Sequence, residues 1–315
     1  MTRYVVRRVV ALVAILFVTS FLVFAGLHLA PGSPESFLLQ GKTVSPETIA
    51  SIRAQYHLDD PFLVQYARWL SGVVRGDLGR SLVFRQEVAG LLWSRIPTTL
   101  FLAAYASILI LTIGLVLGAI AALKRGWADS TILIGTTVAA ATPSFVAAIV
   151  LISVFAVRLG WLPAFGAGKG TLGRLEHLTM PAVALALSYL ALVARVTRSA
   201  MIEELGREHV ETARVRGVPE SAILRRHVFR NALAPIATIA GIVVAGLLTA
   251  AVVVESAFGL NGLGSLLVQS VNVKDFPVVQ AIALLLVGVF VVTNLIVDLL
   301  YGVIDPRVRL GEGAR

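Results

Sequence analysis

The stretch closest to a catalytic motif is Gly41-Lys42-Thr43, which matches the end of the phosphate-binding pattern G-x-x-x-x-G-K-[ST]. The first glycine of that pattern would fall at position 36, which is occupied by Ser36. A second glycine-rich stretch, Gly259 to Gly264, follows an apolar helical run and not a strand, so it does not fit a dinucleotide-binding turn. We therefore expect no nucleotide site on this chain.

The chain also lacks the residue patterns that would bind a metal ion or supply a catalytic nucleophile. The chain has no cysteine, which excludes disulfides, thiol catalysis and Cys-ligated zinc. Its five histidines are scattered, and no H-E-x-x-H pair occurs. We expect no catalytic residue, no metal ion and no cofactor bound by this chain, so an intramembrane enzyme would have no set of reacting groups.

Three polar residues lie at the edges of long apolar runs. Asn294 and Asp298 are four residues apart, which places them on one helix face near the cytoplasmic end of the last run. Glu255 ends the preceding run, where the helix dipole disfavours a carboxylate. A pathway or gating role and a packing or interfacial role are both open for these residues. Paired charges in the middle of a run, which a proton-coupled carrier would use, do not occur.

The composition indicates a membrane protein. Of the 315 residues, 57% are hydrophobic and only 14% are charged, whereas an ordinary soluble domain carries about 25% charged residues. The net charge of +9 could suggest nucleic acid binding. In a chain this apolar, we interpret the positive charge as a bias among membrane loops and expect no nucleic acid partner.

Six apolar runs are long enough to cross a lipid bilayer as helices. The first has 21 residues and would span about 31 Å, longer than the core of a typical signal peptide, so we interpret it as an uncleaved span. Pro143 should kink the third span, and Pro181 fits the first turn of the fourth. The runs are Val9–Leu29, Thr98–Leu123, Ser130–Leu159, Leu178–Val196, Ala232–Val254 and Pro277–Tyr301.

Small residues recur at four-residue spacing in the second and fifth runs, which lets helices pack closely. We expect this close packing to occur within one bundle, with a subunit interface as the alternative. The two stripes are Gly114, Gly118 and Ala122, and Ala237, Gly241, Ala245 and Thr249.

The basic residues assign the two sides of the membrane. The N-terminus, the loop 124–129, the segment 195–231 and the C-terminus hold 16 of the 27 Lys and Arg residues. The short loops on the opposite side hold four, and the long first loop holds the other seven. Because cytoplasmic loops carry the excess of Lys and Arg, both termini are expected in the cytoplasm. The expected fold class is an all-α polytopic membrane protein with six transmembrane helices.

The first loop, from 31 to 97, is too long for a simple turn. Ser45-Pro46 and Asp60-Pro61 each resemble a helix start, with an N-cap residue followed by proline at the first helical position. We therefore expect a small extracytoplasmic helical subdomain. The expected organisation is a cytoplasmic N-terminus and first helix (1–30), this subdomain (31–97), a five-helix core (98–301) that includes a cytoplasmic segment (197–231), and a cytoplasmic tail (302–315).

One charged segment interrupts the apolar chain. From Ile202 to Val215 the pattern is helical but strongly polar, so this segment cannot stay in the bilayer. Gly217 supplies a helix end or a left-handed turn, and Pro219 fits the start of a second short helix that runs from Glu220 to Arg230. Two short helices that meet at a glycine would form a rigid projection. A helix lying on anionic lipid would explain the arginines of the second helix. It would not explain the glycine corner, the turn at Gly217 where the two helices meet.

The corner Glu211-Thr212-Ala213-x-x-x-Gly217 resembles the cytoplasmic E-A-A-x-x-x-G loop of the inner-membrane permease subunits of ABC importers. The resemblance covers nearly the whole chain and points to the dipeptide, oligopeptide and nickel permeases, in particular the first of the two paired subunits. One departure is Pro31-Gly32-Ser33-Pro34, where relatives often carry P-G-D-P. The other matching blocks are Tyr4–Arg8, His57–Leu82, Arg226–Ile236 and Asn294–Arg309.

The resemblance implies a subunit that forms half of a translocation pathway for peptides or similar small solutes in the inner membrane of a prokaryote. Its implied partners are a homologous second permease, an extracytoplasmic substrate-binding protein and two cytoplasmic ABC ATPases, which bind ATP and Mg. The permease itself would then hydrolyse nothing. The loop would be a coupling helix, with Thr212 at the second position of the motif. In it, Glu211 would orient the loop through polar contacts, Ala213 would allow close approach and Gly217 would permit the turn.

The main alternative is a secondary transporter or channel driven by an ion gradient. Co-purification from mild detergent distinguishes the two, because only an importer subunit brings an ATPase and a second permease. The sequence does not identify the substrate, the residues that line the pathway, or whether the two permeases are identical.

Overall fold

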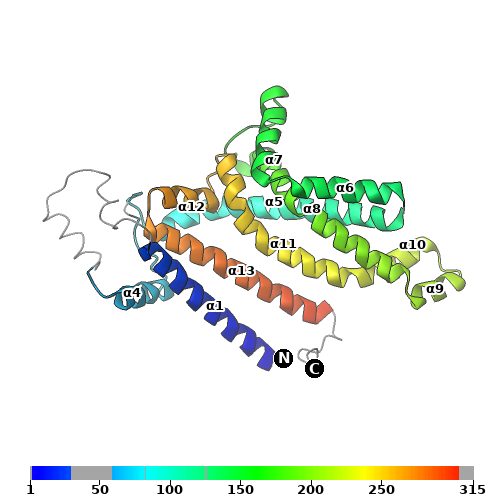
Figure 1. The fold of residues 1–315 in the computed structure, drawn as a ribbon, viewed down its shortest axis with the longest axis horizontal. Helices are drawn as coiled ribbons and strands as arrows, with labels where there is room; N and C mark the ends of the chain where they lie inside the picture. The colour runs from blue at the N-terminus through cyan, green and yellow to red at the C-terminus, as the bar shows by residue number, and fades with distance from the viewer. Residues whose placement is uncertain (1, 30–58, 82, 125, 305–315) are drawn as a thin grey trace. The chain divides into compact units, whose positions relative to one another are not determined.

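Residues 2–29, 59–81, 83–124 and 126–304 are described by a computed structural model of the chain (Figure 1). Within these ranges the regular structure is helical, and extended backbone pairs only at an isolated antiparallel bridge between Arg80 and Glu87. Five single helices are long and apolar enough to cross a membrane, and a bent pair supplies a sixth span if it is counted as one. The all-α polytopic fold class is confirmed.

The chain divides into two compact units. Of the described residues, the α8 unit contains those of 99–260 and 290–304, and the α4 unit contains those of 2–98 and 261–289. Several expected features lie outside the described residues, so the structure does not test them. They are Pro31–Pro34, Gly41-Lys42-Thr43, Ser45-Pro46 and the tail from 305.

The α4 unit is built on two sets of contacts. One is an apolar core in which the start of α5 packs against α12 and α13, with Val88, Leu266 and Ile282 fully buried. The other joins α4 to α1 through aromatic rings. The helices that contribute to this unit are α1 (Thr2–Leu29), α4 (Phe62–Val74), the start of α5 (Val88–Leu123), α12 (Leu263–Asn272) and the start of α13 (Phe276–Ile304).

Tyr66 is the centre of the contact between α4 and α1. Its side chain is 6% exposed, and its hydroxyl lies 2.8 Å from Ser20 Oγ. The rings of Phe21 and Phe24 lie 5.3 and 5.4 Å from the Tyr66 ring, centroid to centroid, which is the range in which aromatic pairs stabilise a core. The helical spacing of the aromatic residues after Pro61 therefore marks the face of α4 that packs on α1.

The α8 unit is a bundle around one long central helix. α8 (Gly170–Leu205) packs against α6 (Trp127–Ala141), α7 (Ser144–Leu151) and α11 (Phe229–Ala257), and Figure 1 shows α6 and α11 running beside it. The shorter elements are the π-helix η1 (Ile152–Arg158), α9 (Glu208–Val215), α10 (Glu220–Ile223) and the π-helix η2 (Leu224–Val228).

Two glycines of α5 let this helix approach α8 closely. A Cβ atom added to Gly114 would lie 2.8 Å from Val193 Cγ1, and one added to Gly118 would lie 2.6 Å from the carbonyl oxygen of Ala194. Real Cβ atoms do not approach other atoms this closely, so only glycine fits. At these two positions the expected close packing within the bundle is confirmed.

The prolines behave differently from their sequence-based expectations. Pro143 does more than kink the third span, because α6 and the α7–η1 pair meet there at 96°. Pro181 does not start a helix: α8 begins at Gly170, and Pro181 lies inside it. Pro61 is the N-cap residue of α4 and not its first helical residue. A helix can continue past the end of an apolar run, so hydropathy misplaced the start of α8.

The expected second short helix from Glu220 to Arg230 is also corrected. α10, η2 and α11 follow one another without a break, so the chain from Glu220 to Ala257 is one continuous helix. The register changes through the π-helical turn at Leu224–Val228. The projection therefore consists of one short helix, α9, and the first turns of the fifth span, which begins at Glu220 and not at Ala232.

Candidate functional site

A left-handed turn at Gly217 joins α9 to α10. Gly217 has φ +75°, the N–H of Val218 donates to the carbonyl of Ala213 at 3.1 Å, and the N–H of Gly217 donates to the carbonyl of Arg214 at 3.0 Å. These two bonds form a Schellman motif, which caps the last carbonyls of a helix and needs a residue with positive φ. A Cβ atom at Gly217 would meet nothing within 4 Å, so the requirement for glycine is conformational and not steric.

The inner face of α9 is part of the hydrophobic core of the α8 unit. Val210 is fully buried and Ala213 is 8% exposed. Both pack in one cluster with the end of α8 and the continuous helix that starts at Glu220. The other members of this cluster include Met201, Ile223, Val228 and Ala232. Apolar side chains buried on three elements therefore join α9 to its neighbours in one core.

Glu204 adds a polar link at the same place. Its side chain is largely buried, and its two carboxylate oxygens have different partners. Arg207 Nε lies 3.0 Å from Oε1, and Asn231 Nδ2 donates to Oε2 at 3.1 Å. Glu204 ends α8, Arg207 precedes α9 and Asn231 lies on α11, so one carboxylate connects the elements on both sides of the projection.

A second ion pair spans the corner itself. Arg214 Nη2 donates to Glu220 Oε1 at 2.6 Å, and Arg214 Nε donates to Glu220 Oε2 at 3.1 Å. The hydrogen bond to Glu220, and then its negative charge, raise the pKa of Arg214. A two-point contact of this kind fixes orientation as well as distance. The corner is thus held by backbone, apolar and ionic contacts together.

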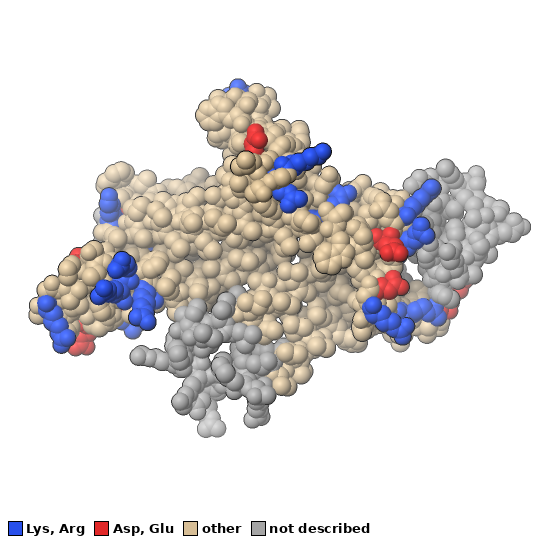
Figure 2. Space-filling view, turned by 180° about the vertical axis from the view of Figure 1, so that it is seen from behind, with Lys and Arg blue, Asp and Glu red and all other residues tan. Residues whose placement is uncertain are grey.

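The outer face of α9 is open. Glu211 and Thr212 are exposed, and Val215 is 84% exposed. Within the described residues, the carboxylate of Glu211 has no hydrogen bond, and the negative charge of Glu211 contributes to the raised pKa of Arg214. Figure 2 shows basic side chains gathered where α9 and α10 lie. The exposed arginines of this region are Arg207, Arg214, Arg216, Arg225, Arg226 and Arg230.

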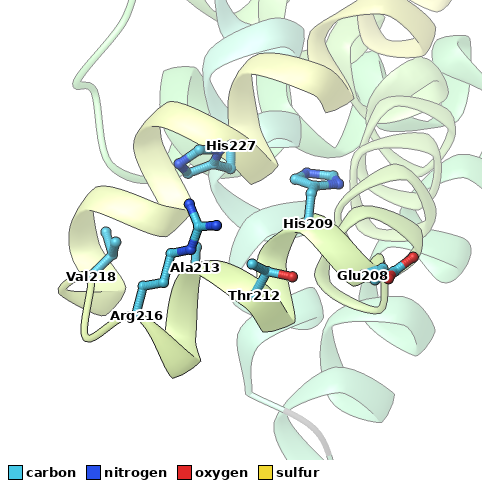
Figure 3. Close-up of a pocket in the computed structure, with 7 residues that line it drawn as sticks. All are labelled: Glu208, His209, Thr212, Ala213, Arg216, Val218 and His227. Atoms are coloured by element: carbon cyan, nitrogen blue, oxygen red, sulfur yellow. The ribbon is translucent and has the colours of Figure 1, made fainter.

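Part of this region is hollowed. A pocket of about 460 Å³ lies between α9 and η2, and Figure 3 shows the side chains that line it. Thr212 and Ala213, from the expected coupling loop, belong to its wall. The remaining wall residues are Glu208, His209, Arg216, Val218 and His227.

The three residues considered for a pathway or gate are not brought into this site. Glu255 is fully buried near the end of α11, where Thr99 Oγ1 donates to its Oε1 at 2.6 Å. This arrangement favours a packing role, since the carboxylate does not face open space in this chain. Asn294 Nδ2 donates to the carbonyl of Phe290 at 2.9 Å. The side chain of Asp298 lies outside the described part, so its pairing with Asn294 stays a prediction.

Two family descriptions match almost the entire chain. Residues 114–310 match the binding-protein-dependent transport system inner membrane component, and residues 1–103 match the N-terminal membrane component of the same systems. The chain belongs to this permease family. It is therefore a multi-pass permease subunit of an ABC importer, and the alternative of a secondary transporter is set aside.

Full-length relatives of the permease agree with this assignment. It is 38% identical over 313 residues to a peptide transport system permease protein of Brucella abortus (strain 2308). It is 37% identical over 310 residues to the glutathione transport system permease protein GsiC of Escherichia coli (strain K12). Both matches cover 98% of this permease and 99% of the relative.

Solved structures share the fold of the permease. A chain of the inward-facing MetNI methionine ABC transporter superposes with a TM-score of 0.56 at 19% identity, covering 68% of the permease and 96% of that chain. A chain of an amino acid ABC transporter with histidines gives a TM-score of 0.51 at 21% identity, covering 70% and 94%. Membership in a family of membrane subunits agrees with the expectation of a non-catalytic chain.

Sequence reasoning missed two polar links in the permease. One is the set of contacts around Glu204, and the other joins α6 to α8, where Arg198 donates to both carboxylate oxygens of Asp129 at 2.6 and 2.5 Å. The partners are 27 and 69 residues apart. A basic residue three positions after Glu204 is a local signal of an ion pair, but no local signal identifies Asn231 or Asp129.

Proposed function

We propose that this permease forms half of the pathway through which an ATP-driven importer takes up peptides or peptide-like small solutes. We also propose that α9 and the Gly217 corner couple the permease to an ATPase. The observation that carries the coupling proposal is that α9 has one buried face and one exposed face. Its inner face is packed against α8 and α11, whereas its outer face is exposed and charged. The names of the relatives, for peptide and glutathione transport, support the substrate class.

The coupling step is mechanical. An ATPase subunit that seats α9 in a groove would displace α9 when ATP binding draws the two ATPases together. Because α9 shares a core with α8 and α11, the displacement would pass to these two spans as a rigid-body movement between two states. The buried link of Glu204 to Arg207 and Asn231 would prevent α9 from moving alone.

The proposed assembly follows from the same assignment. Basic residues are most frequent in the segments we place in the cytoplasm, which are the two termini, the loop 124–129 and the segment 195–231. Two ABC ATPases would bind ATP and Mg on that side, a homologous second permease would complete the pathway, and a substrate-binding protein would deliver the solute from outside. None of the relatives described above is named for nickel, so peptides are the first substrates to test.

The test replaces Gly217 by valine. A β-branched residue with positive φ is strained by about 1–2 kcal/mol, so Gly217→Val should distort the corner while membrane insertion continues. The matched control is Gly76→Val, because Gly76 also has a positive φ, occupies the same kind of turn after α4, and has nothing within 4 Å of an added Cβ.

The measurements are ATPase co-purification from mild detergent and the stimulation of ATP hydrolysis by a peptide-loaded binding protein. We expect both to be lost in Gly217→Val, and co-purification to persist in Gly76→Val. Full stimulation in a properly inserted Gly217→Val permease would overturn the coupling role of the corner. Absence of any ATPase from the unmodified complex would overturn the assembly itself.

A further inference from the structure

The pocket between α9 and η2 contains an arginine that has no ionic partner among the residues the structure describes. Arg216 projects its guanidinium into the pocket, toward His227 (Figure 3). It forms no ion pair within the described residues, in contrast to Arg214, which is paired with Glu220. A guanidinium stays charged at every physiological pH. This pocket therefore presents a permanent positive charge inside a concave wall.

Two histidines and two carboxylates are the other ionisable groups near Arg216. The rings of His209 and His227 lie 6.1 Å apart, centroid to centroid, and both line the pocket with Arg216. Glu204, the buried carboxylate next to His209, already accepts from Arg207 and Asn231. Glu208 is the one acidic residue of the wall, and Figure 3 shows its carboxylate at the far side from Arg216.

The wall also has an apolar part. Ala213 and Val218 line the pocket beside Arg216, and both pack in the core cluster. A ligand that fits this pocket would thus combine an anionic head with a short apolar stem. A planar guanidinium binds a carboxylate through two parallel N–H···O bonds. Aspartate and glutamate side chains have this combination of head and stem.

We propose that this pocket receives an aspartate or glutamate side chain of the ATPase subunit on which α9 docks, with Arg216 as its two-point partner. This inference rests on the coupling function proposed above and names the contact that performs it. An arginine in the wall of a concave, partly apolar pocket has the features of an interface hot spot. An anionic lipid surface is disfavoured, because Glu208 and Glu211 are exposed on the same helix and would be repelled by it.

The first experiment compares two charge reversals in the complete transporter, with its ATPase co-expressed. Arg216→Glu places a carboxylate in the pocket, whereas the control Arg225→Glu makes the same charge change at an exposed arginine that does not line the pocket. We expect Arg216→Glu to weaken ATPase binding by about 30-fold, as the loss of a hot-spot contact does. Arg225→Glu should change it by only a few-fold.

The two variants separate the possible outcomes. Equal losses in both would show that general positive charge is recognised and would overturn the proposal. Normal ATPase binding by Arg216→Glu, with reduced binding of the permease to phosphatidylglycerol vesicles, would assign the pocket to lipid and would also overturn it. A wild-type complex without ATPase would refute the coupling function and not only this contact.

The second experiment identifies the partner residue. The chain has four lysines, at 42, 124, 169 and 274, so Arg216→Lys introduces the only primary amine in the segment 195–231. Carbodiimide converts a carboxylate into an O-acylisourea, the introduced amine attacks the acyl carbon, and the urea leaves with one carboxylate oxygen. The result is an amide bond formed with net loss of water.

Mass spectrometry then shows which ATPase residue is joined. We expect an amide between position 216 and one Asp or Glu of the ATPase, and no such product from the control Arg225→Lys. An ATPase that remains bound to Arg216→Lys without this cross-link, or that cross-links equally in both variants, would contradict the proposed contact.

Discussion

Asn231 and Glu204 meet across 27 residues of sequence, with Asn231 Nδ2 donating to Glu204 Oε2 at 3.1 Å. Glu204 lies in the last turn of α8 and Asn231 in the first turn of α11. Between these two residues the chain forms α9 and the Gly217 corner. The hydrogen bond therefore closes the base of the projection, beside the apolar core that α9 shares with the two spans.

Glu204 provides the first prediction. Glu204→Ala should remove an acceptor shared by two side chains, which leaves Asn231 Nδ2 with the His209 ring nitrogen at 3.4 Å and Arg207 with Glu203 Oε1 at 2.8 Å. Because Asn231 and Arg207 also reach solvent, the loss should be about 1 kcal/mol, the net value of an intramolecular hydrogen bond. Glu204→Gln keeps an oxygen that can accept from Asn231 and serves as the control. Hydrogen exchange of the α9 amides should increase in the alanine variant and change little in the glutamine variant. Equal exchange in the two variants would show that this hydrogen bond does not hold α9.

Gly118 provides the second prediction. An added Cβ would lie 2.6 Å from the Ala194 carbonyl oxygen and 2.6 Å from Thr197 Cβ, and a backbone carbonyl cannot rotate away. Gly118→Ala should therefore force α5 from α8 and destabilise the permease by about 1–3 kcal/mol, the usual range for overpacking.

The control is Gly135→Ala in α6, because an added Cβ there meets nothing within 4 Å and alanine favours a helix. Thermal unfolding in detergent should give a lower midpoint for Gly118→Ala than for the wild type, and an equal or higher midpoint for Gly135→Ala. A Gly118→Ala midpoint at the wild-type value would mean that the approach of α5 to α8 is looser than the structure shows.

Asp275 provides the third prediction, which concerns pH. Asp275 is 2% exposed at the junction of α12 and α13. Burial raises its pKa above the ordinary aspartate value, although hydrogen bonds from the hydroxyl of Ser81 and from backbone N–H groups oppose the shift. A raised pKa means that folding favours the protonated form. The destabilisation is absent below the ordinary aspartate pKa and grows as pH rises from there through the pKa of the folded state.

Asp275→Asn should remove this dependence, because asparagine is neutral and can still accept from Ser81. Relative to the wild type, the variant should gain thermal stability at pH 7, and the gain should shrink as pH falls toward 4. Unfolding midpoints of both proteins across this range test the sign. A variant whose advantage increases on acidification would show that Asp275 is stabilising as a carboxylate.

The sequence by itself determined the class of the protein. Six long apolar runs can bury their backbone polar groups in a bilayer only as helices, so the membrane fold followed from composition and length. Gly217 was also identified locally, because a left-handed turn after a polar helix favours glycine whatever surrounds it. Pro143 was identified locally as a bend, but its 96° angle was not, and Pro181 lies inside α8 without ending it.

Only the tertiary structure decided what those elements contact. The burial of Glu255 against Thr99, the link of Glu204 to Asn231, and the continuation of the helix from Glu220 to Ala257 all join residues that local patterns treat separately. The pocket around Arg216 arises in the same way, because its wall comes from α9, the corner and η2. Hydropathy and turn propensity act within a few residues, whereas these features depend on contacts between chain segments that are brought together only when the helices pack.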